Sequence, residues 1–110
     1  MRTFTKEELK TLRLSITELL EFVRCVKWKD EPYFYRFLDN MKNNIEIYLY
    51  TQSGEVGLLC EILSRDWQAA NNRLTGIPSC ELMPEKEGVW HLHCKYRELV
   101  ADVGRYFLEK

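Results

Sequence analysis

The sequence predicts an all-α fold, either a four-helix antiparallel bundle or another compact helical domain. Apolar residues recur at every third or fourth position in four separate segments, which is the spacing of one face of an α-helix. The chain holds fifteen leucines against eleven valines and isoleucines, a composition that favours helix over strand. A length of 110 residues suits one hydrophobic core, so we expect a single helical domain over residues 1–110.

The first helix is expected to run from Thr5 to about Lys29. Thr5 can act as the N-cap, and Glu8, three residues later, can complete a capping box. Pro32 disfavours helical backbone at the residue before it, so the helix should end ahead of this proline. The predicted buried face consists of Leu9, Leu12, Ile16, Leu19, Leu20, Val23 and Val26.

The second helix is expected to begin near Glu31 or Pro32, because proline is favoured in a first turn. Its predicted buried face consists of Phe34, Phe37, Leu38, Met41, Ile45, Tyr48 and Leu49. The third helix should start around Ser53 or Gly54, and Gly76 is a suitable stop. Its predicted buried face consists of Val56, Leu59, Cys60, Leu63, Trp67, Ala70 and Leu74.

The fourth helix is expected from about Pro84 onward. The run Pro-Glu-Lys-Glu places proline and acidic residues in a first turn, where the helix dipole favours negative charge. Its predicted buried face consists of Val89, Leu92, His93, Tyr96, Leu99, Val100, Val103 and Phe107.

An α+β fold is the alternative architecture. Residues 45–62 and 80–94 also alternate well enough to form two hairpins of a small antiparallel sheet. The connection from Thr75 to Met83 is long for a compact bundle. This alternative stays open at the level of the sequence.

Charge and hydropathy narrow the classes of partner. Sixteen lysines and arginines oppose seventeen acidic residues, whereas a protein that follows a phosphate backbone usually carries a basic segment. No apolar run approaches the length of a membrane span, and the N-terminal residues MRTFTKEELK are too charged for a signal peptide. We therefore expect a cytoplasmic protein that does not bind a membrane, and the balanced charge argues against nucleic acid as its main partner.

Two histidines and a cysteine lie close together near the C-terminus, at His91, His93 and Cys94. On a helix the two histidines point to nearly opposite sides, so they cannot bind one ion together. His91 and Cys94 are three residues apart and could provide two ligands, with Cys80 as a third. A metal-binding regulator that uses Cys80, His91 and Cys94 is therefore one alternative function.

Recognisable catalytic patterns are missing from the sequence. It contains no common nucleotide-binding, hydrolase, metalloprotease or calcium-binding motif. Acidic pairs such as Glu18 and Glu21 lie off the apolar faces and fit a solvated surface. We expect a protein that is not an enzyme and that needs no cofactor.

Several apolar residues lie off the predicted buried faces, which indicates either a contact surface or an irregular packing in which one helix is central and buried on two sides. In the second and third helices they are Tyr35, Ile47, Tyr50, Leu58, Ile62 and Ala69. In the fourth they are Trp90, Cys94, Ala101 and Leu108, beside Arg97 and Arg105. The segment 26–37 adds five aromatic residues and several bases. Aromatic and arginine side chains dominate interface hot spots, so the predicted protein-binding residues are Trp28, Tyr33, Tyr35, Arg36, Trp90, Arg97 and Leu108.

The sequence thus predicts a small non-catalytic protein-binding module, such as an adaptor, inhibitor, immunity or regulatory protein. Its expected partner is another protein or a second copy of the chain, as in a homodimer. A second alternative function is single-stranded nucleic-acid binding by the Trp28–Phe37 segment, whose aromatic residues could stack on bases.

Overall fold

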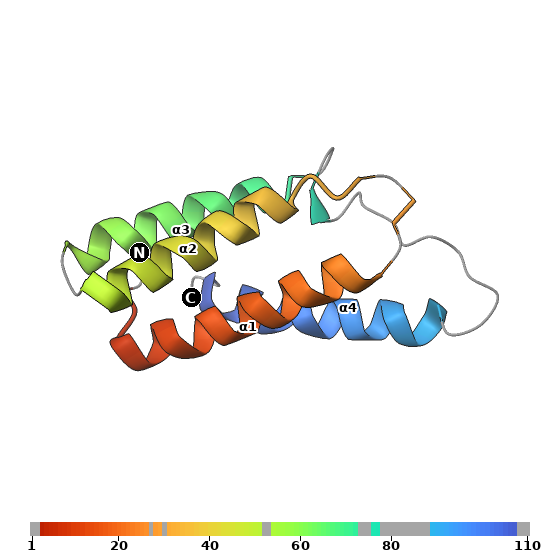
Figure 1. Cartoon of the computed structure of the whole chain (residues 1–110), viewed down its shortest axis with the longest axis horizontal. Helices are drawn as coiled ribbons and strands as arrows, with labels where there is room; N and C mark the ends of the chain where they lie inside the picture. Colours follow the sequence, from red (N-terminus) through yellow and green to blue (C-terminus); the bar gives the residue numbers. More distant parts are fainter. Residues whose placement is uncertain are drawn as a thin grey trace.

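The computed structural model describes residues 3–26, 28–29, 31–51, 54–72, 76–77 and 89–107. This part of the chain forms four α-helices, α1 (Lys6–Cys25), α2 (Tyr35–Thr51), α3 (Val56–Ala70) and α4 (Val89–Gly104), followed by the 3₁₀ turn η2 (Arg105–Phe107). Successive helices run in opposite directions (Figure 1). The predicted all-α fold is confirmed.

The alternative sheet is wrong wherever the structure describes it. Residues 45–51, 56–62 and 89–94 are helical, while residues 80–88 lie outside the described ranges. The physical reason is visible in α2, where Ile45 is fully buried and Ile47 is 60% exposed. A strand would place Ile45 and Ile47 on the same face, whereas a helix places Ile45 with Leu49, four residues later.

The predicted capping box at the start of α1 is confirmed. The Glu8 backbone N–H donates to the Thr5 hydroxyl at 3.1 Å, and the Thr5 N–H donates to the Glu8 carboxylate at 3.1 Å. The end of α1 differs, because Val26 is already extended and the helix stops at Cys25. The Trp28 indole N–H donates to the Val23 carbonyl at 2.9 Å. This bond satisfies one of the last carbonyls of the helix, which lack partners along the helix itself.

Both α2 and α3 begin later than expected. The chain makes a turn after Pro32, whose carbonyl accepts from the Tyr35 N–H at 3.0 Å, and α2 starts there. Glu55 is the N-cap of α3, preceded by Gly54 in the left-handed conformation that favours glycine (φ 99°).

α3 ends earlier than expected, and the structure describes α4 only from Val89 onward. α3 ends at Ala70, well before Gly76, because the backbone of Asn71 leaves the helical conformation (φ −98°, ψ 19°), and the Asn71 side-chain amide donates to the Trp67 carbonyl at 2.9 Å. The predicted start of α4 near Pro84 lies outside the described ranges, which resume at Val89.

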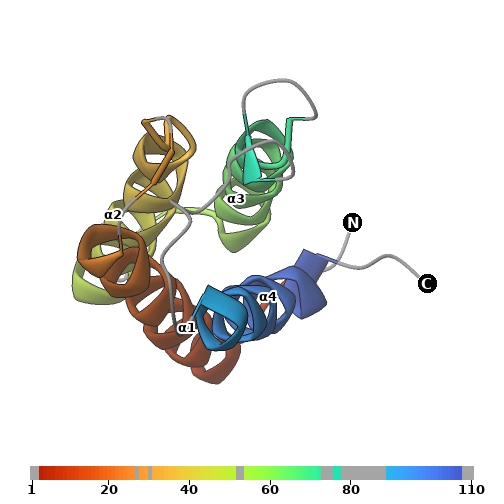
Figure 2. The same ribbon diagram turned by 90° about the vertical axis from the view of Figure 1, so that its right-hand side faces the viewer.

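The helices surround a core that follows the predicted apolar faces. α1 packs on both α2 and α4, and α3 packs on α2; an end-on view shows this order (Figure 2). The largest fully buried side chains are Phe34, Leu9, Leu12, Ile16, Leu19, Leu38, Met41, Ile45, Leu63 and Val103. Val26 is only half-buried because it lies past the end of α1. Other residues predicted to be buried are half-buried as well, namely Phe37, Tyr48, Leu49, Val56, Trp67, Leu92, His93, Val100 and Phe107. The predicted burial of Leu74 and Val89 lies outside the residues whose burial is described.

Two aromatic clusters join helices that are distant in sequence. In the first, the Trp28 ring lies 5.7 Å from Phe34 and 5.3 Å from Tyr96, and Phe22 stacks on Tyr96 at 5.8 Å. This cluster connects the end of α1, the start of α2 and the middle of α4.

The second cluster lies between α3 and the end of α4. Phe4 contacts Tyr106 at 6.0 Å and Phe107 at 5.7 Å, and Phe107 stacks on Trp67 at 5.8 Å. The Phe4 N–H also approaches the Cys60 sulfur at 3.4 Å. In the described part of the chain, α3 packs less extensively on α4 than on α2, and these rings are among the contacts between α3 and the end of α4. None of the helices described is both long and apolar enough to span a membrane.

Candidate functional site

Five large apolar side chains of the described residues remain exposed to solvent. They are Leu14, Tyr33, Ile47, Tyr50 and Leu58. Tyr50 is the most exposed, with 90% of its surface accessible. Single exposed apolar residues are ordinary on a protein surface, and only those that share a concave surface indicate a binding site.

Ile47 and Tyr50 both line a shallow groove between α1 and α2 that is widely open to solvent and has a volume of about 670 Å³. Its lining consists of Lys10, Arg13, Glu46, Ile47, Leu49, Tyr50 and Thr51. The first half of α1 supplies the two basic residues, and the last turns of α2 supply the rest. We call this surface the α1–α2 groove.

The helical repeat explains why these side chains meet at the groove. On α2, residues 46 and 50 are one turn apart, and so are residues 10 and 13 on α1. Glu46 links the two walls, because its carboxylate lies 3.9 Å from Arg13 of α1 and 3.4 Å from Lys42 of α2. The apolar side chains of α2 therefore lie beside a basic wall formed by α1.

The predicted protein-binding residues lie in different environments. Tyr33 (58% exposed) and Arg36 are exposed at the start of α2, and Arg97 is exposed on α4. Tyr35 is half-buried against the core, and the Arg24 guanidinium lies 5.9 Å from its ring centre. The side chain of Trp90 and the whole of Leu108 lie outside the described residues.

Trp28 is the predicted residue with the most internal position. Its ring packs on Phe34 and Tyr96, and its indole N–H is already used by the Val23 carbonyl. Phe34, in the same segment, is 1% exposed. Phe34 is therefore covered by protein, while Trp28 is half-buried and uses part of its ring in the core.

The predicted metal ligands are only partly described. His91 is exposed and Cys94 is half-buried, both on α4, while Cys80 lies outside the described ranges. Among the residues that the structure does describe, no group of three histidine, cysteine or acidic side chains is arranged to hold a metal ion.

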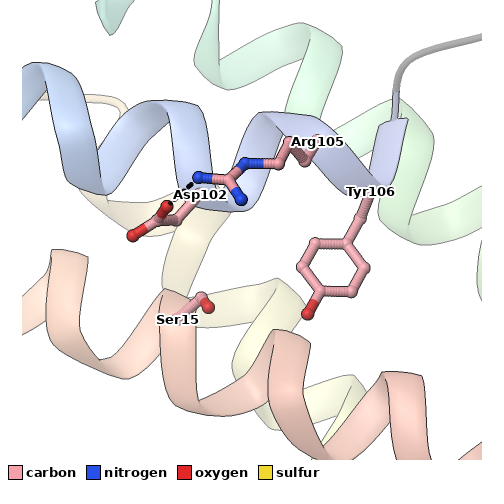
Figure 3. Close-up of a pocket in the computed structure, with 4 residues that line it drawn as sticks. All are labelled: Ser15, Asp102, Arg105 and Tyr106. Atoms are coloured by element: carbon pink, nitrogen blue, oxygen red, sulfur yellow. Dashed lines mark hydrogen bonds and ion pairs between the residues drawn. The ribbon is translucent and has the colours of Figure 1, made fainter.

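A second, smaller pocket of about 200 Å³ lies between α1 and the end of α4. It is lined by Ser15 from α1 and by Asp102, Arg105 and Tyr106 from the other wall (Figure 3). Arg105 donates to the Asp102 carboxylate at 2.6 Å, and both side chains are substantially exposed. The charges of this pocket are thus paired with each other in contact with water, where an ion pair contributes little.

One carboxyl has an altered acidity. Burial raises the pKa of Asp66 on α3 above its usual range, and the neighbouring Arg65 guanidinium lowers that pKa by a smaller effect. Asp66 does not line the α1–α2 groove, so we assign this shift to the packing of α3.

The sequence indicated only part of the α1–α2 groove. Ile47 and Tyr50 were singled out because they lie off the apolar face of their helix, but Lys10, Arg13 and Leu49 were not. The spacing of residues within one helix does not reveal which residues of another helix lie opposite. No protein-family model, characterised protein or solved structure matches this chain.

Proposed function

We propose that this chain is a non-catalytic protein-binding module and that the α1–α2 groove is its binding surface. The observation that supports this proposal is the exposure of two large apolar side chains, Tyr50 and Ile47, in one concave site. An unbound surface of this kind leaves apolar area in water that a partner would cover.

The residue types of the groove suit a protein partner. Tyrosine and arginine are enriched in interface hot spots. Truncating a hot-spot residue to alanine weakens binding by about 2 kcal/mol or more. Covering an exposed isoleucine side chain contributes roughly 1.5–3 kcal/mol when burial is complete. The groove combines these residue types in Tyr50, Arg13 and Ile47.

A photo-crosslinking experiment tests the groove directly. The photoreactive amino acid benzoylphenylalanine replaces Tyr50 in one version of the chain and Gln68, exposed on α3, in a matched control. After irradiation in the source cell lysate, we expect defined protein adducts from position 50 and few from position 68. Equal adducts from both positions, or none from position 50, would contradict the proposal.

A pair of alanine variants separates specific contacts in the groove from non-specific binding to exposed apolar side chains. Ile47 and Leu58 have nearly equal exposure, 60% and 56%, but Ile47 lines the groove and Leu58 is not among its lining residues. In chains carrying the crosslinker at position 50, Ile47→Ala should reduce adduct yield, whereas Leu58→Ala should leave it unchanged. The same assay with Tyr33→Ala and Arg36→Ala shows whether the start of α2 adds a second contact surface.

A further inference from the structure

The charge around the α1–α2 groove differs in sign from the charge of the whole chain, which is −1. Three basic residues, Lys10, Arg13 and Lys42, face two acids, Glu7 and Glu46, in the lining and its ion pairs. Glu46 lies 3.4 Å from Lys42 and 3.9 Å from Arg13, so these five side chains together carry one net positive charge. A carboxylate entering the groove would meet a net positive wall.

The basic residues of α1 are accessible to an incoming acid. Lys10 approaches Glu7 at 3.7 Å, but the two side chains are 59% and 86% exposed. An exposed pair of this kind is held weakly, so a better-placed carboxylate can replace Glu7 beside Lys10. Arg13 lies 3.9 Å from Glu46, at the outer limit of an ion pair, and its remaining guanidinium N–H groups can donate to a second acceptor.

The size of the apolar wall fits an α-helix. From Glu46 to Thr51 the wall rises about 8 Å along α2, at about 1.5 Å per residue. Two apolar residues at positions i and i+3 or i+4 of a helix lie about 5–6 Å apart. A helix can therefore place two successive apolar residues along this wall, against Ile47 and Tyr50.

We propose that the groove binds an acidic amphipathic α-helix of a partner protein. The inference rests on the proposed function and specifies the chemistry of the partner. The apolar face of the helix covers Ile47, Leu49 and Tyr50, and its flanking carboxylates lie beside Lys10 and Arg13. Helix binding in a groove derives affinity from the apolar residues, while charge complementarity selects the partner.

Two matched peptides serve as probes. The first is a synthetic helix of about 16 residues, long enough to be marginally helical in water, with leucine at i, i+3, i+4 and i+7 and glutamate at the flanking positions. The second carries lysine in place of every glutamate. Fluorescence anisotropy of labelled peptides with the full chain should show the acidic peptide binding about tenfold more tightly at low salt, with a smaller difference at high salt.

Charge reversal in the groove provides the decisive variant. Lys10→Glu combined with Arg13→Glu should invert the preference, so that the lysine peptide binds more tightly. The matched control, Arg65→Glu combined with Lys95→Glu, makes the same change in net charge at exposed positions of α3 and α4 and should keep the original preference. Circular dichroism confirms that both variants fold.

The outcomes are distinct. Three results would contradict the proposal that the groove binds an acidic helix. They are equal binding of the two peptides, no binding of either peptide, and a preference that charge reversal in the groove does not change. Protein adducts from position 50 would still support the proposed function in each of those cases. A mass that doubles with concentration in light scattering, and that Tyr50→Ala abolishes, would put a second copy in the groove and also overturn this inference.

Discussion

At the scale of single residues, two aromatic side chains show how environment decides their role. Trp28 is held by the Val23 carbonyl and by two rings, whereas Tyr50 is 90% exposed. Trp28 lies among lysines and acids, whereas Tyr50 ends the apolar run from Ile47. The bases beside Trp28 predict a binding residue there, but the chain turn that brings Trp28 against the core depends on Phe34 and Tyr96, which local sequence does not reveal.

Because of these environments, removing the Trp28 ring and removing the Tyr50 ring should affect the stability of the fold very differently. Trp28→Ala removes a packed ring and leaves the cluster with Phe34 and Tyr96 incomplete, so we expect a loss of about 3 kcal/mol in the free energy of unfolding. Tyr50→Ala removes no packing and should change that free energy by less than about 0.5 kcal/mol. Urea unfolding followed by circular dichroism measures both. A stable Trp28→Ala protein would show that the ring contributes little to the core.

Asp66 gives a prediction about pH. Since its pKa is raised in the folded chain, the folded state holds the proton more tightly than the unfolded state does. The contribution of Asp66 is therefore most favourable below its ordinary pKa of 3.8, and it is lost as pH rises through the higher folded value. At neutral pH the ionised carboxylate destabilises the fold.

Asp66→Asn keeps the size of the side chain and removes its charge. We expect the variant to be more stable than the parent at pH 7, by no more than about 0.5 kcal/mol because the carboxyl is only partly buried and water screens its charge. The difference between the two proteins should shrink as the pH falls towards 3. Urea midpoints at both values test this, and a difference that grows at low pH would contradict the assigned burial effect.

At the scale of helices, the start of α1 was predicted correctly but its end was not. The capping box of α1 needs only Thr5 and Glu8, which lie three residues apart, and local sequence reveals it. The end of α1 depends on Trp28, whose ring is positioned by Phe34 and by Tyr96 of α4. An end that depends on contacts distant in sequence cannot be read from the helical repeat.

The capping box should contribute measurably to stability. Thr5→Ala leaves the Glu8 N–H without its side-chain acceptor, so we expect a loss of about 1 kcal/mol in the free energy of unfolding. Thr11→Ala is the matched control: Thr11 lies within α1 and its hydroxyl donates to the carbonyls of Glu7 and Glu8. This substitution should be neutral or slightly stabilising, because alanine has the higher helix propensity. Thermal unfolding of the two variants tests this prediction. An equal loss of stability in both variants would contradict a specific contribution from the capping box.

At the scale of the whole molecule, the order of the helices decides what the sequence could not show. The apolar faces predicted the buried residues well in α1 and only in part in α4, where Leu92, His93 and Val100 are half-buried. A helix buries one face whatever its neighbour is, but the neighbour decides how wide that face is. The apolar faces did not specify that α1 would lie between α2 and α4. The α1–α2 groove depends on this arrangement, since Lys10 and Tyr50 are forty residues apart in sequence and meet only after packing.

The same arrangement leaves α3 and α4 joined by side chains that come from both ends of the described chain. Phe4 contacts Tyr106 and Phe107, and its N–H approaches Cys60 of α3. Phe4→Ala should therefore lower the free energy of unfolding by about 3 kcal/mol. It should weaken the packing of α3 against the end of α4 more than the packing of α1 against α2. We expect amide hydrogen exchange to accelerate most in α3 and in the last turns of α4, and less in α1 and α2.

Phe22→Ala is the control for this effect, because Phe22 stacks on Tyr96 and joins α1 to α4 at the other aromatic cluster. Its removal should accelerate exchange at the α1–α4 contact and leave α3 comparatively protected. A uniform increase across all four helices in Phe4→Ala would show that the whole core unfolds as one unit and that Phe4 has no special role between α3 and α4. A selective increase would mean that the N-terminal residues before α1 complete the helical arrangement, and that α3 depends on them to stay beside α4.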